Sequence, residues 1–310
     1  MVDANTIPAR IPATLNVAIM AAQVAACAGI FVALSRVDSA WQVGLLALAF
    51  AIVGNSIYAI MHEAMHGVLL PNAKANAVCG SLMALLFPAS FHLLRQAHLL
   101  HHMRNRSDDE AFEYWFDGES PVWKWMQLYC ILTGVYWLII VVSNFVVLVF
   151  PFILRKRFFK FDRPTAGLME SFNPRYWRVI RIEALLAIAL HTGVVLGLGV
   201  PLLRYCLVYA AFGFVWSAMQ YTHHFDTRRD VIEGSRNVWV FPLVDTLWLN
   251  HDWHRVHHRH PTLPWNYLAK LGRVEDGQRS FALWHYLRMW RGPRRAVEHV
   301  ENHYAGRLIR

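Results

Sequence analysis

Four long apolar segments constrain the fold of this chain more than any other feature of its sequence. They cover residues 11–35, 40–61, 182–200 and 202–221. A helix needs about 20 mostly apolar residues to cross the hydrocarbon core of a bilayer, and each segment is close to that length. Only 16% of the residues are charged, against about 25% in soluble domains. The sequence therefore predicts an all-α, multi-span integral membrane protein in which residues 1–310 form a single membrane-embedded domain.

Short connections join these segments in pairs, so each pair predicts a hairpin of spans. Residues 36–39 connect the first two segments, and Gly197, Gly199 and Pro201 interrupt the apolar sequence between the last two. Glycine and proline commonly end helices. Two such hairpins return the chain to the side of the membrane on which it started.

Two further apolar segments do not fit a simple count of spans. Residues 77–94 are barely long enough to cross and contain Pro88, whereas residues 122–154 exceed one span but fall short of two. If each crossed once, the histidines at 62–66 and 98–102 would face opposite sides of the membrane. We therefore expect 77–94 to be re-entrant or interfacial and 122–154 to form a short tilted hairpin, although a single crossing of 122–154 stays open.

Basic residues indicate the orientation of the chain. The net charge is +9, and arginines and lysines gather at 155–160 and 288–295, beside apolar segments. Such runs normally mark the cytoplasmic side, so we expect a multi-pass protein of the bacterial inner membrane with its functional face in the cytoplasm. No separate basic face suggests nucleic-acid binding. The four cysteines are far apart, which argues against a disulfide framework. Residues 1–3 lack the basic start of a signal peptide, so we expect none.

Histidines are numerous and clustered in four stretches of the chain. Of the 17 histidines, most lie at 62–66, 98–102, 223–224 and 251–260. Residues three or four apart share one face of a helix, so each cluster can point several imidazoles in one direction. About eight or nine imidazoles would then meet at the cytoplasmic edge of the membrane. That number is too large for one tetrahedral zinc and suits two metal ions, for which iron is a good match to imidazole.

Chance spacing and ordinary interfacial histidines are the simpler alternative. One histidine pair spaced by four arises readily, but two separate HxxHH groups near the same predicted face are hard to explain in this way. Ionisable groups beside membrane spans are costly, which favours a functional reading.

The spacing resembles the three histidine boxes of the membrane fatty acid desaturase and hydroxylase superfamily. The boxes read His62-Glu63-Ala64-Met65-His66, His98-Leu99-Leu100-His101-His102 and His254-Arg255-Val256-His257-His258. The sequence HHMRNRSDDE that begins with the last two histidines of the second box is similar to the family pattern HHxxTNxxDxD, and HHRHPTLPW is similar to its HHxxPxxP ending. The similarity extends from about residue 50 to 270.

This resemblance implies a set of metal ligands. The eight box histidines would bind two non-haem irons, and a ninth ligand would be His224, with His223 as its rival. These ligands are His62, His66, His98, His101, His102, His224, His254, His257 and His258. Relatives have an asparagine four residues before the ninth histidine that contacts the site through water, whereas this chain has Gln220.

Other residues could orient the ligating histidines through hydrogen bonds. Ligating histidines usually donate their second nitrogen to a carboxylate or carbonyl. The candidates are Glu63, Asp108, Asp109, Gln220, His223, His251 and Asp252. The alternative for each of them is an ordinary polar residue in a solvated loop. His92, His191, His285, His299 and His303 have no suitably spaced partners, so we expect them to be structural.

The resemblance implies an O2-dependent oxidase that attacks a C–H bond of a long fatty acyl chain. Desaturation is favoured, and hydroxylation or oxidative decarboxylation are the other outcomes. HEAMHG and HHRHPTLPW are also similar to carotenoid ketolases, so a carotenoid ketolase or hydroxylase, or an alkane hydroxylase, is an alternative. Aromatic residues near the boxes are candidates to line an apolar substrate channel, although membrane-interface belts would explain them equally: Phe91, Trp115, Trp123, Trp125 and Trp216.

Electrons would have to come from a separate partner of the ferredoxin, rubredoxin or cytochrome b5 type. The basic region from Arg288 to Arg295 could dock such a donor, while attraction to anionic membrane lipids is the simpler explanation of its charge.

A different class of enzyme shares one of these motifs. His62-Glu63-Ala64-Met65-His66 also matches HExxH, the signature of zinc metalloproteases. An intramembrane protease would use one zinc and would leave both HxxHH groups without a role. A non-enzymatic metal or haem carrier is a third reading, which O2 consumption would exclude.

Overall fold

The computed structural model describes residues 9–275 and 277–302, and this part of the chain is mostly helical. The α-helices are α1 (Ala13–Leu34), α2 (Ala40–His66), α3 (Ala73–Leu86), α4 (Phe91–Arg104), α5 (Pro121–Leu132), α6 (Val135–Val149), α7 (Arg163–Ser171), α8 (Trp177–Gly197), α9 (Leu202–Thr222), α10 (Pro242–Leu247), α11 (His254–Arg259), α12 (Trp265–Glu275) and α13 (Ala282–Met289). Short 3-10 turns cover Pro151–Ile153, Lys156–Phe158 and Pro174–Tyr176.

Two small parallel strand pairs tie distant loops together. The strands are β1 (Tyr114–Trp115), β2 (Val238–Trp239), β3 (Ser280–Phe281) and β4 (Arg294–Arg295). Strand β1 pairs with β4, and β2 pairs with β3. Each pair joins the segment after α13, or the one before it, to a loop much earlier in the chain.

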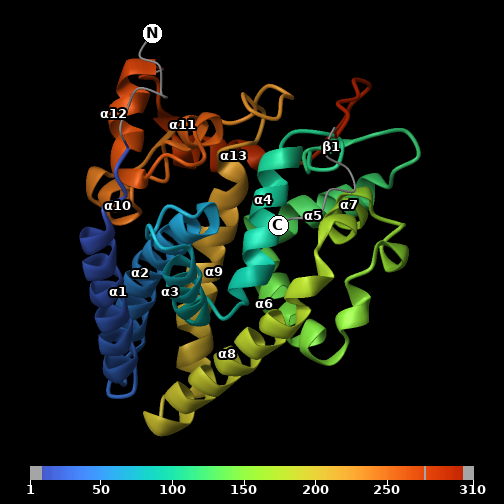
Figure 1. Cartoon of the computed structure of the whole chain (residues 1–310). Coiled ribbons are helices and arrows are strands. Elements are labelled where there is room, and N and C mark those ends of the chain that lie inside the picture. The colour runs from blue at the N-terminus through green and yellow to red at the C-terminus, as the bar shows by residue number, and fades with distance from the viewer. Residues whose placement is uncertain (1–8, 276, 303–310) are drawn as a thin grey trace.

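Four helices are long and apolar enough to cross a membrane. They are α1, α2, α9 and the helix Pro174–Gly197, which continues a 3-10 turn into α8. The four apolar segments of the sequence fall on these helices, but α2 runs five residues past its expected end at 61. The first histidine box therefore lies inside the last turns of a spanning helix. Figure 1 shows α1, α2 and α9 standing side by side, with α8 running obliquely past the lower end of α9.

Each of the two segments that did not fit a simple count of spans, 77–94 and 122–154, is broken between two helices. The chain bends by 101° between α3 and α4 and by 93° between α5 and α6, so the structure has up to six candidate spans if each bent pair counts as one. The segment 77–94 is interrupted at 87–90, and α4 then continues to Arg104. The second bend lies at Gly134, which has a φ of +86°, and a Cβ there would lie 2.8 Å from the backbone of Phe214 in α9. Glycine is needed at this turn for both reasons.

Aromatic side chains fill the space between α2 and α9. Phe50 of α2 lies with its ring centroid 4.7 Å from that of Tyr209 and 5.9 Å from that of Phe212, both on α9. Phe212 in turn packs edge-on against Phe87. These buried rings fix the distance between the middle parts of the two central helices.

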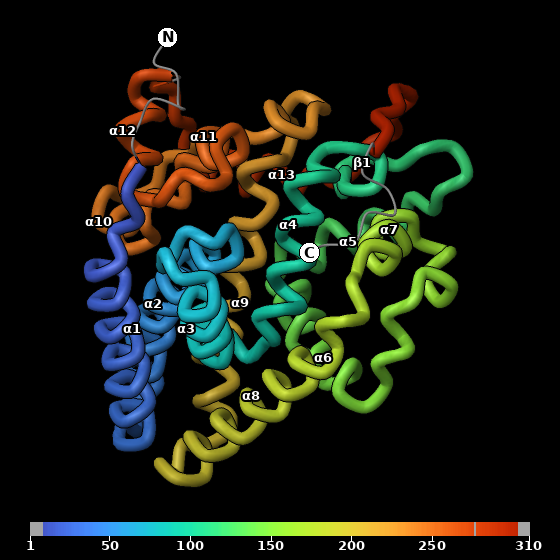
Figure 2. The backbone as a smooth tube through the Cα atoms, in the orientation of Figure 1, coloured from blue at the N-terminus to red at the C-terminus, as the bar shows by residue number. Residues whose placement is uncertain are grey.

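The C-terminal helices form a cap on one end of this bundle. In Figures 1 and 2 the segments α10–α13, drawn in orange, cover the upper ends of α1, α2 and α9. One buried residue, Asn16, connects cap and bundle: its side-chain nitrogen donates to the Leu69 carbonyl at 2.8 Å, and its oxygen accepts from Trp265 Nε1 at 2.9 Å. All four histidine clusters lie at the capped end.

The close approach of α2 and α9 gives a test of this packing. A Cβ added at Gly54 of α2 would lie 2.5 Å from Phe212 Cδ2, whereas one at Gly44 of the same helix meets nothing within 4 Å. We expect Gly54→Ala to destabilise the protein by about 1–3 kcal/mol, because overpacking displaces a buried ring. We expect Gly44→Ala to be neutral or slightly stabilising, because alanine favours a helix. Thermal unfolding in detergent measures both, and equal melting temperatures would contradict the packing.

Candidate metal centre

The first two ligand candidates lie at the end of α2. His62 and His66 are four residues apart, so both project from the same face of its last turns. The adjoining main chain turns at once, since Gly67 has a φ of +78° and ends the helix in a left-handed cap. The histidine pair is therefore held at the junction between the apolar bundle and the cap.

The two HxxHH groups lie on the last turns of α4 and on the six-residue helix α11. His224 follows the end of α9 by two residues. Four separate stretches of chain thus deliver imidazoles to the capped end of the bundle. Their nine rings form two groups, in each of which the candidate ligand nitrogens lie within 4.8 Å of one another. The first group is His62, His66, His98, His102 and His257, and the second is His101, His224, His254 and His258.

The split between the groups follows helical geometry. His98 and His102 are four residues apart and enter the first group, whereas His101 is rotated about 100° from His102 and enters the second. The same rule places His254 and His258 together and sends His257 to the first group. Each HxxHH sequence therefore serves both groups. The groups are neighbours, because the rings of His102 and His258 stack with centroids 4.3 Å apart.

Distances within the groups match a shared metal better than ordinary packing. In the first group, His98 Nε2 lies 2.7 Å from His66 Nε2 and 3.1 Å from His102 Nε2. In the second, His254 Nε2 lies 3.0 Å from His224 Nε2 and 3.2 Å from His258 Nε2. A metal–nitrogen bond of about 2.1 Å places neighbouring ligands at a right angle about 3 Å apart.

An unpaired nitrogen supports the same conclusion. His62 Nε2 is buried and accepts or donates no hydrogen bond among the described residues. Buried polar atoms normally have a partner. The residues present fit a pair of metal ions: five imidazoles could surround one ion and four the other, and neither group contains a thiolate or a carboxylate.

Two of the nine histidines have their second nitrogen anchored. His101 Nδ1 lies 2.5 Å from Glu110 Oε1, and His224 Nδ1 donates to the Gly234 carbonyl at 3.0 Å. Such contacts fix the tautomer, so that Nε2 is free to bind a metal. Neither Glu110 nor Gly234 was among the candidates taken from the sequence. Glu110 ends the sequence HHMRNRSDDE, so its acidic character was the available signal.

His223 and His251 lie beside the groups but outside them. His223 Nδ1 donates to the Met219 carbonyl at 2.8 Å, and its Nε2 faces Asp252 Oδ1 at 3.2 Å. The ring of His251 lies between the groups, with centroids 4.6 Å from that of His62 and 5.1 Å from that of His254. His223 and Asp252 thus form a polar pair next to His254, whose ring lies 4.4 Å from that of His223.

The other supporting candidates make different contacts. Gln220 Oε1 accepts from the Tyr58 hydroxyl at 3.1 Å. Glu63 Oε2 accepts from the Trp265 backbone at 3.0 Å, while its Oε1 lies 4.0 Å from His62 Nδ1. Asp108 and Asp109 instead hold Arg163 and the segment 299–302. The sequence could not distinguish these two carboxylates from Glu110.

The histidines expected to be structural have partners away from the two groups. His92 Nδ1 lies 2.8 Å from Glu183 Oε1, and His191 Nε2 lies 2.7 Å from the Leu85 carbonyl. His285 Nε2 lies 2.7 Å from Ser280 Oγ, and His299 Nδ1 lies 2.7 Å from Asp108 Oδ2. His303 lies outside the described residues.

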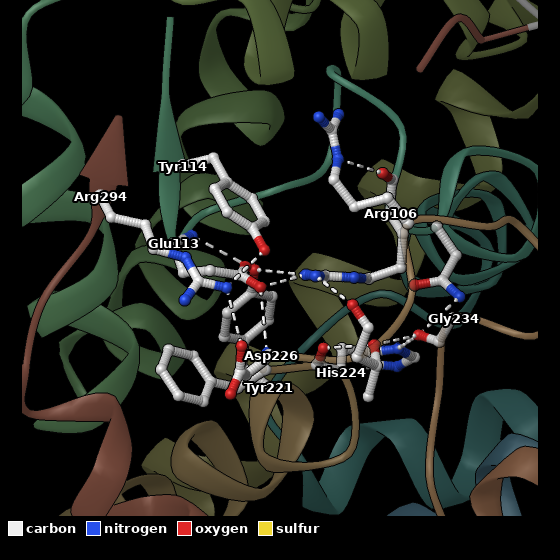
Figure 3. A network of polar contacts seen from close by, with 12 residues as sticks. Arg106, Glu113, Tyr114, Tyr221, His224, Asp226, Gly234 and Arg294 are labelled. Carbon is white, nitrogen blue, oxygen red and sulfur yellow. Dashed lines mark hydrogen bonds and ion pairs between the residues drawn. The ribbon is translucent and has the colours of Figure 1, made fainter. Parts of the chain in front are cut away.

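A buried polar network surrounds the backbone that accepts the hydrogen bond from His224 (Figure 3). The Gly234 carbonyl that accepts from His224 also accepts from Asn105 Nδ2 at 3.2 Å. The next residue, Arg106, is fully buried and pairs with Glu113, which accepts the backbone N–H of Asp226 at 3.1 Å. Removing one partner of such a pair leaves an uncompensated buried charge. The network therefore fixes the loop that follows α9.

The polar face of α11 is held by one carboxylate. Glu233 accepts from Arg259 Nη2 at 2.7 Å and from Arg255 Nη2 at 2.9 Å. The hydrogen bond from Arg259, with a further contribution from Arg255, lowers the pKa of the Glu233 carboxyl to about 2. The carboxylate is thus charged at any physiological pH and clamps the helix that carries the third box.

The Glu110–His101 contact predicts an effect on metal affinity. Glu110→Gln removes the charge that orients His101, and we expect the affinity of the second group to fall roughly 10–100-fold. Titration of the purified protein with a competing chelator, followed by metal analysis, measures this loss. Glu170→Gln is the matched control, because Glu170 pairs only with the exposed Lys156 among the described residues. Equal affinities in the two variants would contradict the role of Glu110.

Comparison with known families places this geometry in context. The family model for fatty acid desaturases matches residues 39–293, which include all nine histidines of the two groups. A comparison with curated proteins finds no match. Because the family model covers most of the sequence, the chain belongs to the fatty acid desaturase family.

Proposed function

We propose that this protein is an O2-dependent, di-iron oxidase that attacks a C–H bond of a long fatty acyl chain, with desaturation as the favoured reaction. Its family consists of oxidoreductases that act on fatty acyl chains. The single observation that carries the finer proposal is the division of nine imidazoles into two adjacent groups. When bound, two irons would supply the activation of O2 and the removal of hydrogen from an unactivated carbon.

The donor set favours a pair of irons over one zinc. Catalytic zinc sites usually have three protein ligands and one open position, whereas these groups offer five and four imidazoles. Imidazole is a good ligand for iron. In the metalloprotease alternative Glu63 would be the general base, but its Oε2 accepts from the Trp265 backbone and the groups need histidines outside the HExxH sequence. We therefore propose that His62 and His66 belong to a larger iron site.

Aromatic side chains lie where an acyl chain would meet the histidines. The ring centroid of Tyr58 lies 6.1 Å from that of His62, 5.3 Å from that of Trp216 and 5.8 Å from that of Phe87. These residues join the apolar core to the first histidine group. We propose that they contact the substrate and keep water from the reacting carbon.

The other aromatic candidates from the sequence make different contacts. Trp123 Nε1 donates to Asp162 at 2.9 Å, Phe91 packs against Gly80 and Trp125 against Gly292. Trp115 belongs to strand β1. Of the five candidates, Trp216 is the one that lies beside Tyr58 and the first group.

We propose that the bundle and its cap form one membrane-embedded domain, with the histidines on the cytoplasmic side of a bacterial inner membrane. The four to six apolar helices support a multi-pass arrangement, and basic residues beside α6 and α13 support the orientation. In this arrangement α3–α4 would be re-entrant or interfacial and α5–α6 would form a short tilted hairpin.

Lipid analysis tests the reaction directly. Lipids from cells that make the intact protein are compared by mass spectrometry with those from cells that make His257→Ala. Loss of two hydrogens from an acyl chain supports desaturation, a gained oxygen indicates a hydroxylase, and a shortened terminal alkene indicates a decarboxylase. Altered carotenoids or alkanes with unchanged acyl chains would replace the acyl substrate by one of those classes.

Metal content tests the two-group arrangement. We expect about two irons per wild-type chain. His257→Ala removes a ligand of the first group and His254→Ala one of the second. We expect close to one iron in each variant, because no neighbouring side chain replaces the lost ligand. Inductively coupled plasma mass spectrometry of the purified protein measures iron and zinc together. His299→Ala is the control, because this histidine lies away from both groups. One zinc per wild-type chain, or an unchanged iron content of two per chain in both ligand variants, would contradict the proposal.

An external electron donor of the ferredoxin, rubredoxin or cytochrome b5 type is a further part of this proposal. Arg288 and Arg294 both pair with Asp226, and Arg295 pairs with Asp117, so neutralising them would also break internal ion pairs. The side chain of Arg291 has no hydrogen bond or ion pair with the part of the chain that the structure describes. Arg291 is therefore the cleaner probe of donor docking.

We expect Arg291→Glu to slow donor-dependent turnover several-fold, and most strongly at low salt, because docking of an acidic partner depends on surface charge. Iron content should not change. Steady-state assays with a purified donor at two ionic strengths measure this effect, and Arg157→Glu in the distant basic segment is the control. Equal turnover of the two variants would remove the docking role of this region.

A further inference from the structure

A polar pocket of about 370 Å³ lies outside both histidine groups, behind the third box. Its walls come from the loop after α9, the start of α11 and the residues before β3. Four arginines contribute to these walls: Arg228, Arg236, Arg255 and Arg279. Neither the metal proposal nor the acyl substrate requires such a pocket.

Buried hydrogen-bond donors without partners belong to residues that line this pocket. Ser235 and Asn237 are 3% and 2% exposed, yet Ser235 Oγ and Asn237 Nδ2 have no hydrogen bond within the described chain. Arg236 Nε and Arg279 Nη2 are also buried and unpaired there. Native proteins rarely leave buried polar atoms unsatisfied. Each of the four atoms can donate a hydrogen bond, so a ligand that fills the pocket must be rich in acceptors.

The charge of the pocket selects an anion. Its one carboxylate, Glu233, is already paired with Arg255 and Arg259. Asp245, which lies outside the lining, pairs with Nη1 of Arg279 but leaves Nη2 unpaired. Arg228 is exposed, and the structure shows no side-chain partner for it among the described residues. An excess of positive charge therefore remains available at the pocket.

We propose that this pocket binds a phosphate group, either that of a water-soluble organic phosphate or that of a lipid head group. A phosphate offers more acceptor oxygens than a carboxylate and pairs with planar guanidinium groups through two hydrogen bonds at once. The unpaired donors belong to two separate stretches of the pocket wall, residues 235–237 and Arg279. This site is independent of the irons and goes beyond the proposed oxidation.

A ligand in this pocket would contact residues that hold the helix of the third box in place. Asn237 Oδ1 accepts from the backbone N–H of Arg255 at 3.0 Å, so one wall residue holds the beginning of α11. Gly234, which orients His224, is next to Ser235 in the sequence. A bound phosphate therefore contacts the same loop that positions ligands of the second group.

Ser235→Ala is the most informative variant. Removing a buried hydroxyl that has no protein partner should leave the melting temperature of the ligand-free protein unchanged or higher, because no hydrogen bond of the protein is lost. The same change should weaken phosphate binding about tenfold, because a donor to an anion is lost. Arg228→Gln should weaken it by a similar factor. Arg273→Gln, at an exposed arginine of α12 that does not line the pocket, is the charge-matched control.

Binding is measured on the purified, full-length protein by calorimetry with inorganic pyrophosphate, and in nanodiscs that contain phosphatidic acid or only phosphatidylcholine. Pyrophosphate binding that phosphatidic acid does not displace identifies a soluble phosphate. Displacement by phosphatidic acid identifies a lipid head group. Either result supports the pocket, provided that Ser235→Ala and Arg228→Gln weaken binding and Arg273→Gln does not.

Three outcomes overturn the proposal. They are no binding of either probe, equal binding by the pocket variants and the control, and displacement of pyrophosphate by acetate at similar concentrations. The first would mean that ordered water satisfies the buried donors, the second that the probe binds elsewhere on the protein, and the third that the pocket is a carboxylate site. Because the readout is binding and not oxidation, failure here leaves the di-iron proposal untouched.

Discussion

The convergence of nine imidazoles at one end of the helix bundle is the constraint on which the rest of the structure depends. The rings come from α2, α4, the end of α9 and α11, yet their nitrogens fall into two compact groups. Such an arrangement tolerates little movement, because a ring displaced by 1 Å no longer reaches its position. The buried aromatic contacts between α2 and α9, the glycine-dependent approach at Gly54 and the polar cap together hold the four segments in register.

Helical periodicity explains how one short sequence can serve both groups. In HxxHH the outer histidines share a face, and the middle one is rotated toward the neighbouring group. Both HxxHH helices use this rule in opposite senses: α4 gives two rings to the first group and one to the second, and α11 does the reverse. His62, His66 and His224 complete the sets.

Much of the fold and of the candidate site could be predicted from the sequence. Apolar length located the four long helices, because a membrane leaves little choice of structure to such segments. Histidine spacing indicated the eight box histidines, and the family resemblance added His224; the structure brings these nine rings together. The amphipathic helices α12 and α13 were not predicted, because they are short and lack long apolar runs. The Glu110–His101 contact and the Gly234 carbonyl depend on how loops fold in space, so nothing in their spacing distinguished them from Asp108 or Asp109.

The position of α11 after all four long apolar helices has a consequence for how the protein is made. His257 belongs to the first group, and His254 and His258 belong to the second, so neither group is complete before this helix has left the ribosome and docked. The spanning helices α1, α2, α8 and α9 all precede it and can enter the bilayer earlier. If the two groups bind metal as proposed, loading would therefore be a late step of biogenesis, after membrane insertion and after α11 has docked.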